Sequence, residues 1–313
     1  MPRKYLRLNT MTINLRVSKS EILFLYESTF SIPNGDPFTG EQRYDDETKK
    51  VLVSDVRIKR FIRDYFIDHD YEVYLTNSGG IVTSEKRMEL LKNKYDKEAG
   101  ANKKEKSKNG LSMMKKCLDV RLFGGISTEK GDSVNLTGAV QFALLNPSLN
   151  AVDLRIHQNT SVFSSTDDKK RGAIGTTTIV PYCINQIHGW INPYSAVHTD
   201  LTQEDINLMC EALWNSVNNA NTRSKSNQNS LLLLQIVYQK PTDKLYGLDK
   251  LIKLISDKQG EQLRSSEDYT LDFSGINQAT SVDKVLQVNF YTENQQWKEE
   301  LEKIEKFSLM LLV

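Results

Sequence analysis

The chain has 313 residues, of which 39% are hydrophobic and 26% charged, and its net charge at pH 7 is +1. This length suits one large domain with insertions or two domains, and the composition is typical of a globular protein. No apolar run is long enough to span a membrane, and the first residues lack the apolar core of a signal peptide. We therefore expect a cytoplasmic protein without a membrane partner.

Charge is unevenly distributed along the chain. Residues 1–240 hold 32 Lys and Arg against 27 Asp and Glu, whereas residues 241–313 hold 9 against 13. The strongest bias lies in residues 86–116, where eleven basic residues accompany four acidic ones. Such a run is typical of a solvated helical insertion or, alternatively, of a surface that faces a polyanion.

Several kinds of chemistry have no support in the sequence. Cys117, Cys183 and Cys210 are odd in number and contain no CxxC pair, which argues against a disulfide framework and a structural zinc site. The four histidines are scattered, and the glycine loops that bind nucleotides, the HExxH pattern and the GxSxG pattern are missing. We expect neither a metal ion nor a cofactor.

The first expected strand, residues 21–30, is followed by a turn-rich stretch, IPNGDPFTGE. The side chain of Asn34 can bond nearby backbone, Gly35 can adopt positive φ, and Pro37 restricts Asp36 to extended conformations. A turn rich in Gly and Asn exposes backbone N–H groups, which bind phosphate without reading bases. Asp36 has a second interpretation, as a carboxylate that aligns a metal-bound water.

A well-marked amphipathic helix is expected over residues 54–66, after a polar loop that ends at Lys50. Ser54 suits its N-cap and Asp55 its first turn. Apolar residues recur at the spacing of a core-facing stripe. The other side of the helix is expected to direct four cations outward, namely Arg57, Lys59, Arg60 and Arg63.

Residues 71–76 have the pattern of a second strand, and the basic insertion follows directly. The next motif, DVRLFGG, offers Arg121 as a cation, Phe123 as a stacking surface and Gly124-Gly125 for close backbone approach. Each has a purely structural alternative. These alternatives are an ion-pair partner, a core residue and a turn.

Three further strands are expected over residues 136–146, 151–163 and 174–192. The last two are joined by a polar, basic, Gly-bearing loop, which predicts a long hairpin that projects from the body.

The remaining pattern begins with a helix over residues 201–220, opened by Thr202 and Asp205 in a variant of the capping box. A polar loop and a buried strand follow within residues 222–240. The acidic tail predicts, in order, a helix over 245–258, a strand over 284–292 and a helix over 296–307.

The order of five segments carries a resemblance to a known family. NGDP, LVSDVRIKRFIRDYF, DVRLFGG, TGAVQF and IVPYCINQIHGWIN follow one another within about residues 21–240. Together they resemble the backbone subunit of CRISPR-associated type I Cascade complexes, the Cas7 family, and most of all its type I-B (Csh2-like) branch.

The resemblance implies an α+β fold, a modified RNA-recognition-motif (ferredoxin-like) palm with a helical insertion and a protruding β-hairpin thumb. Residues 1–313 would form this single domain. The basic, finger-like insertion would occupy residues 77–118 and the thumb residues 158–177, with the acidic elements of 241–313 packing on the palm.

The function that the resemblance implies is that of a non-enzymatic protein of antiviral defence. Copies of the subunit would oligomerise along the spacer of a guide RNA (crRNA) and present it for pairing with target DNA. Its other partners would be further Cascade subunits, namely the large subunit and the repeat-handle-binding subunit, and indirectly the helicase-nuclease.

The same resemblance implies a set of RNA-binding residues. Those expected in the palm are Asn34, Gly35, Lys50, Arg57, Lys59, Arg60, Arg63, Arg121, Phe123, Gly124 and Gly125, and those expected in the thumb are Lys169, Lys170 and Arg171.

Two alternative functions stay open at this point. Related backbone subunits of type III complexes are metal-dependent ribonucleases that cut target RNA with a loop aspartate, for which Asp36 is the candidate. The other alternative is a general single-strand nucleic-acid-binding protein without a CRISPR role.

Overall fold

The computed structural model describes residues 15–76, 80, 83–98, 110–129, 131–160 and 174–312. The predicted thumb cations Lys169, Lys170 and Arg171 lie outside these ranges. None of the helices within them is long and apolar enough to cross a membrane.

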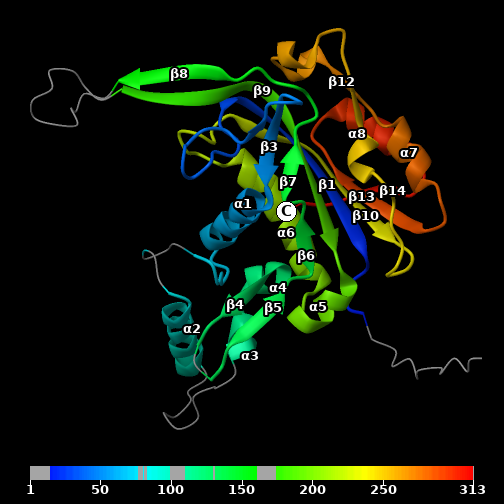
Figure 1. Cartoon of the computed structure of the whole chain (residues 1–313). Coiled ribbons are helices and arrows are strands. Elements are labelled where there is room, and N and C mark those ends of the chain that lie inside the picture. The colour runs from blue at the N-terminus through cyan, green and yellow to red at the C-terminus, as the bar shows by residue number, and fades with distance from the viewer. Residues whose placement is uncertain are drawn as a thin grey trace, which may run out of the picture.

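Helices and strands are mixed, as an α+β fold requires (Figure 1). The strands are β1 (Ser20–Ser31), β2 (Tyr44–Asp45), β3 (Lys50–Ser54), β4 (Gly124–Ser127), β5 (Val134–Thr137), β6 (Val140–Phe142), β7 (Leu145–Pro147), β8 (Arg155–Thr160), β9 (Ile174–Ile191), β10 (Gln228–Tyr238), β11 (Lys253–Ile255), β12 (Thr270–Asp272), β13 (Val285–Tyr291) and β14 (Phe307–Leu309). The α-helices are α1 (Asp55–Asp68), α2 (Ser84–Glu98), α3 (Gly110–Met114), α4 (Leu118–Phe123), α5 (Pro193–Thr199), α6 (Gln203–Asn218), α7 (Ser274–Thr280) and α8 (Gln295–Leu301).

A seven-stranded sheet forms the centre, in the order β14-β13-β10-β1-β9-β6, with β8 paired to one end of β9. β1 pairs antiparallel with both β9 and β10. Side chains of β1 alternate between the two faces, and those at Ile22 to Tyr26 are fully buried. Because both faces are covered, β1 has a nearly continuous apolar sequence.

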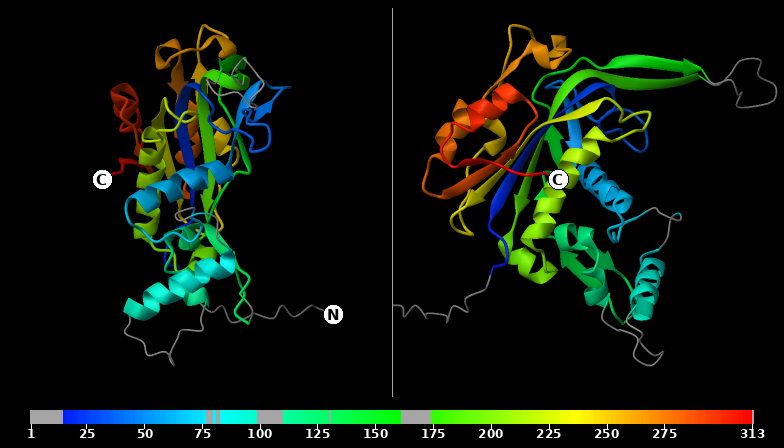
Figure 2. Two further views of the ribbon diagram at one scale, coloured as in Figure 1. Left: turned by 90° about the vertical axis from the view of Figure 1, so that its left-hand side faces the viewer. Right: turned by 180° about the vertical axis from the view of Figure 1, so that it is seen from behind.

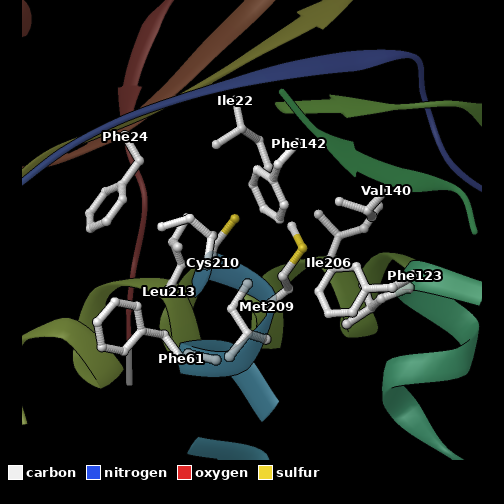
Figure 3. Packing of buried hydrophobic residues seen from close by; sticks show 14 of the residues in the cluster. Ile22, Phe24, Phe61, Phe123, Val140, Phe142, Ile206, Met209, Cys210 and Leu213 are labelled. Atoms are coloured by element: carbon white, nitrogen blue, oxygen red, sulfur yellow. The ribbon is translucent and has the colours of Figure 1, made fainter. Parts of the chain in front are cut away.

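Helices α1, α4, α5 and α6 cover one face of this sheet. Figure 3 shows how their side chains meet it: Phe61 of α1 and Met209 of α6 lie below Ile22 of β1 and Phe142 of β6. The apolar stripe predicted for α1 is therefore confirmed. Its N-cap is confirmed as well, since Ser54 Oγ accepts from Arg57 N–H, and the predicted capping box of α6 is present.

The acidic C-terminal quarter covers the opposite face (Figure 2). Its apolar side chains, Phe273 and Trp297 among them, pack against the strand residues Leu23, Leu25 and Leu234. Most apolar side chains of the C-terminal elements thus lie on the side of the sheet opposite to α1, whereas Tyr291, Met310 and Leu312 pack against the core on the α1 side.

β8 and the first part of β9 form a two-stranded arm that extends away from the body (Figure 1). The register runs from Arg155 opposite Ile179 to Thr160 opposite Ile174, which confirms the predicted pairing. Below the sheet, α2 and α3 pack with β4, β5 and Tyr74 around a small separate core.

Three predictions of secondary structure were wrong. Residues 71–76 form no strand, because the backbone N–H groups of Tyr74 and Leu75 donate to the carboxylate of Asp119 instead of to a neighbouring strand. The helix expected over 245–258 is replaced by a 3-10 turn, Leu248–Lys250, and strand β11.

The third error lies in residues 136–146, which turn twice and contribute to three separate short strands, β5, β6 and β7. In addition, the last helix, α8, ends at Leu301 instead of continuing to 307.

Gly124 and Gly131 both have positive φ, at 77° and 79°, but only Gly124 faces backbone. A methyl group on Gly124 would lie 2.1 Å from the carbonyl oxygen of Leu136, whereas one on Gly131 would have no described atom within 4 Å. The backbone of β5 thus fills the space beside Gly124, as the structural alternative for this glycine requires, and a contact of Gly124 with RNA stays a prediction.

Gly124→Ala should therefore lower the free energy of unfolding by at least about 3 kcal/mol, because conformational strain and a backbone clash add together. Gly131→Ala should cost only about 1 kcal/mol, from the positive φ alone. Urea denaturation of both variants checks this difference, and equal losses would show that the contact with Leu136 is easily relaxed.

Candidate nucleic-acid interface

A cavity of about 570 Å³ lies at the N-terminal end of α1, and we call it the turn groove. Its lining residues are Asn34, Gly35, Pro37, Arg43, Ser54, Asp55, Val56, Arg57, Arg60, Leu144 and Leu145. The structure thus brings the Asn34-Gly35 turn and part of the cationic helix together. Three guanidinium groups from two separate chain segments share this cavity.

The backbone of the turn is largely occupied. The N–H of Asn34 donates to Gln42 Oε1 at 2.9 Å, and that of Asp36 donates to the carbonyl oxygen of Glu41 at 2.7 Å. The expectation that this turn exposes its donors is therefore wrong for both residues. Gly35 differs, since its N–H makes no hydrogen bond within the described part of the chain.

Asn34 instead fixes the position of the turn. Its side chain is buried, and Oδ1 accepts from the backbone N–H of Ser54 at 2.7 Å. Ser54 is the N-cap of α1, so this bond holds the turn against the start of the helix. Sequence reasoning identified both residues but not the bond between them.

Asp36 is held by its own turn. Oδ1 accepts from the N–H groups of Phe38 at 2.9 Å and Thr39 at 3.3 Å, and Oδ2 forms an ion pair with Arg43 at 3.1 Å. The hydrogen bond from Phe38 is the main cause that lowers the pKa of this carboxyl group. This geometry matches the interpretation of Asp36 as a turn former.

The four cations of α1 do not share one environment. Arg57 and Arg60 line the turn groove, where the Arg57 guanidinium lies 3.9 Å from the centre of the Phe61 ring. Burial lowers the pKa of Arg57, and its Nε has no hydrogen-bond partner among the described residues. Arg60 forms an ion pair with Asp64 at 2.6 Å.

Arg63 corrects the expectation that all four cations face outward. Its residue is only 8% exposed, and Nε donates to Asp119 Oδ2 at 2.8 Å. Lys59 lies on the same side of α1, bonded to Asp55 at 3.0 Å and 5.8 Å from the Phe123 ring. RNA contact by these two residues stays a prediction.

The residues of the DVRLFGG motif have the structural roles named above as alternatives to RNA binding. Arg121 forms a bidentate ion pair with Asp205 through bonds of 2.8 and 2.7 Å, and Phe123 is buried in the core. The turn groove is lined neither by these two residues nor by Gly124-Gly125 or Lys50. The structure therefore brings together only Asn34, Gly35, Arg57 and Arg60 of the predicted palm residues.

A second cavity, of about 740 Å³, lies between α1, the end of α6 and the loop of residues 219–227, which we call the α6–β10 loop. Arg57 and Arg60 line this cavity too, so the two cavities meet along α1. Lys225 lines it from the loop, and its Nζ donates to the carbonyl oxygen of Ile32. Burial first, and the nearby Arg57 second, lower the pKa of Lys225 to about 8.

Sequence reasoning missed Lys225, because a lysine in a polar loop is normally exposed. Its Nζ contacts Ile32, just after the end of β1 and 193 residues away in sequence, which no local pattern predicts.

The pKa of Lys225 predicts how stability depends on pH. The folded protein loses this proton near pH 8, whereas the unfolded chain holds it until about pH 10.5. The free energy of unfolding should therefore rise between these two pH values, and Lys225 should add no pH dependence below them. The rise should be on the order of 3 kcal/mol relative to Lys225→Met, which has no such proton. Urea denaturation of both proteins from pH 7 to 10.5 measures it; parallel curves would contradict the lowered pKa.

Comparisons with known proteins agree with the resemblance in the sequence. A protein from Haloferax volcanii described as CRISPR-associated protein Cas7 is 28% identical over 282 residues, which cover 83% of this chain and 82% of that protein. A chain of a solved CRISPR RNA-guided surveillance complex, pre-nicking, has a similar fold, with a TM-score of 0.57 at 13% identity over 94% of this chain and 97% of that one. The family model for CRISPR-associated protein Cas7 matches residues 18–274. The chain belongs to the Cas7 family.

Proposed function

We propose that this protein is the guide-RNA backbone subunit of a type I CRISPR Cascade complex, of subtype I-B. The observation that carries the proposal is the turn groove, where Arg43, Arg57 and Arg60 gather in a chain of the Cas7 family. Three guanidinium groups beside the Gly35 N–H, which has no partner among the described residues, are suited to consecutive phosphates of one strand.

The walls of the turn groove support a sequence-independent mode of binding. Val56 is 67% exposed and Leu144 is 76% exposed, so apolar side chains lie beside the cations. Such surfaces contact sugars and base faces without distinguishing bases. A spacer has arbitrary sequence, so contacts to phosphate and 2′-OH groups must supply most of the affinity.

The arrangement of the chain supports the rest of the proposal. In this proposal the sheet with α1 and α6 is a modified RNA-recognition-motif palm, and the β8–β9 arm is the thumb. Residues 77–118 are the helical insertion of the same single domain. The thumb of one copy, with Lys169, Lys170 and Arg171, would cover the RNA on the next copy. The assembled guide would then pair with target DNA.

The partners in this proposal are the guide RNA, further copies of the chain and the other Cascade subunits. Growth of the oligomer with guide length, followed by native mass spectrometry, separates this function from that of a general single-strand binder.

Loss of two groove cations should weaken binding without changing specificity. For Arg43→Gln combined with Arg60→Gln, we expect the affinity for guides with unrelated spacers to fall by similar factors. The plot of log affinity against log salt concentration should be shallower by about 1.4, that is, by about 0.7 for each lost phosphate contact. Fluorescence anisotropy at several salt concentrations measures both quantities.

The matched control for this experiment is Lys258→Gln combined with Arg264→Gln, which removes two cations from the C-terminal elements. The control should bind like the wild type. An unchanged salt slope in the Arg43 and Arg60 variant would mean that the turn groove does not hold RNA.

We further propose that the subunit is not an enzyme. The Asp36 carboxylate is taken up by two backbone donors and Arg43, which leaves it poorly placed to align a metal-bound water. The assembled complex should therefore leave target RNA intact in the presence of Mg²⁺. Cleavage that disappears in Asp36→Ala, analysed by denaturing gel, would instead identify a ribonuclease.

A further inference from the structure

Phe30 has an unusual conformation at the end of β1. Its φ is +43°, in the left-handed region that bulky side chains rarely adopt, and its side chain is 56% exposed. In the ladder with β9, Thr29 pairs with Tyr182 and Ser31 with Val180, while the position opposite Phe30 is Pro181. Because proline has no N–H to donate, the regular ladder is interrupted at this point.

Both properties of Phe30 are unfavourable in the isolated chain. A left-handed backbone strains a residue with a Cβ atom, and an aromatic ring in water loses the benefit of burial. Glycine would remove both costs at this position. Strained residues of this kind occur preferentially at functional sites, so the surroundings of the ring are a candidate binding region.

Hydrogen bonds place Phe30 beside the α6–β10 loop. The N–H of Thr29 donates to the carbonyl oxygen of Asn227 at 3.0 Å, and that of Ile32 donates to Ser224 at 2.9 Å. Phe30 therefore lies between two residues that are tied to the loop. From Ile32 the chain continues directly to the Asn34-Gly35 turn, so Phe30 lies between segments that line the two cavities along α1.

The α6–β10 loop is rich in donors suited to a nucleic acid. Asn221, Thr222 and Arg223 are exposed, and Arg223 forms no ion pair within the described ranges. Ser216 Oγ, on the α6 wall of the adjacent cavity, is buried and has no partner among the described residues. An exposed ring next to a loop of cations and amides suits a nucleobase better than a protein partner, which would need a continuous apolar patch.

We propose that Phe30 stacks on a base of the bound single strand while Arg223 contacts a neighbouring phosphate. This inference rests on the proposed function and adds a second contact region, beyond the turn groove. The strand would run from the Asn34-Gly35 turn past Arg57 and Arg60 to the α6–β10 loop. Every base has an aromatic face, so this contact tolerates any spacer sequence.

The test compares Phe30→Gly with Phe30→Tyr in the full-length protein. Phe30→Gly should lose about tenfold or more in affinity for single-stranded RNA, while Phe30→Tyr should stay within about twofold of wild type. At the same time Phe30→Gly should keep or raise the melting temperature, because glycine accepts this φ without strain. A loss of binding without a loss of stability excludes misfolding as the cause.

The control variant is Tyr246→Ala, which removes another ring, 89% exposed, from the C-terminal elements. It should leave RNA affinity unchanged. RNA that carries 2-aminopurine at successive positions reports stacking directly, and its fluorescence should be quenched at some positions by wild type but not by Phe30→Gly.

The outcomes separate this inference from the proposed function. Failure of the wild type to bind guide RNA would overturn the proposed function itself. Binding by wild type with equal affinity and equal quenching for Phe30→Gly would overturn only the stacking role. Loss of self-association in Phe30→Gly with unchanged RNA affinity would also overturn it, and would assign the ring to a contact between copies.

Discussion

The buried carboxylate of Asp119 is the interaction on which the arrangement of the cationic helix depends. It is fully buried and accepts from Arg63 Nε at 2.8 Å and from the backbone of Tyr74 at 2.7 Å and Leu75 at 3.2 Å. A buried carboxylate without these donors would be very costly. The bonds join α1, the segment after it and α4 at one point.

This pairing determines which side of α1 each cation occupies. Residues four apart lie on one side of a helix, so turning Arg63 toward Asp119 also turns Lys59 toward Phe123. Arg57 and Arg60 then face the two cavities along the helix. One ion pair in the interior thus divides four similar cations into a pair on the Phe123 side of the helix, of which only Arg63 is buried, and a groove-lining pair.

The sequence was sufficient for features that depend on neighbouring residues. Helix α1, its Ser54 cap and the capping box of α6 follow from local spacing, and the β8–β9 pairing follows from two strands around a polar loop. Features that depend on distant partners were not predictable. Asp119 is 56 residues from Arg63, and its bonds also explain why the strand-like segment 71–76 forms no strand.

The site shows the same division. Asn34, Gly35, Arg57 and Arg60 were identified from turn chemistry and helical spacing, and the structure brings them into one groove. Arg43 and Lys225 were missed, because a cation in a polar loop has no local signal that separates a groove residue from a solvated one. The strained φ of Phe30 has no sequence signal either, apart from the distant Pro181 on the strand opposite.

The central position of β1 has a consequence for synthesis of the protein. This strand is synthesised well before its partners β9 and β10, which begin at residues 174 and 228. At a translation rate of roughly 5–20 residues per second, the apolar segment EILFLY is present on the ribosome for on the order of ten seconds or more before both neighbouring strands have been synthesised. During that time it is an unpaired strand that other chains could pair with, so nascent chains of this protein should depend on chaperones more than its ordinary composition suggests.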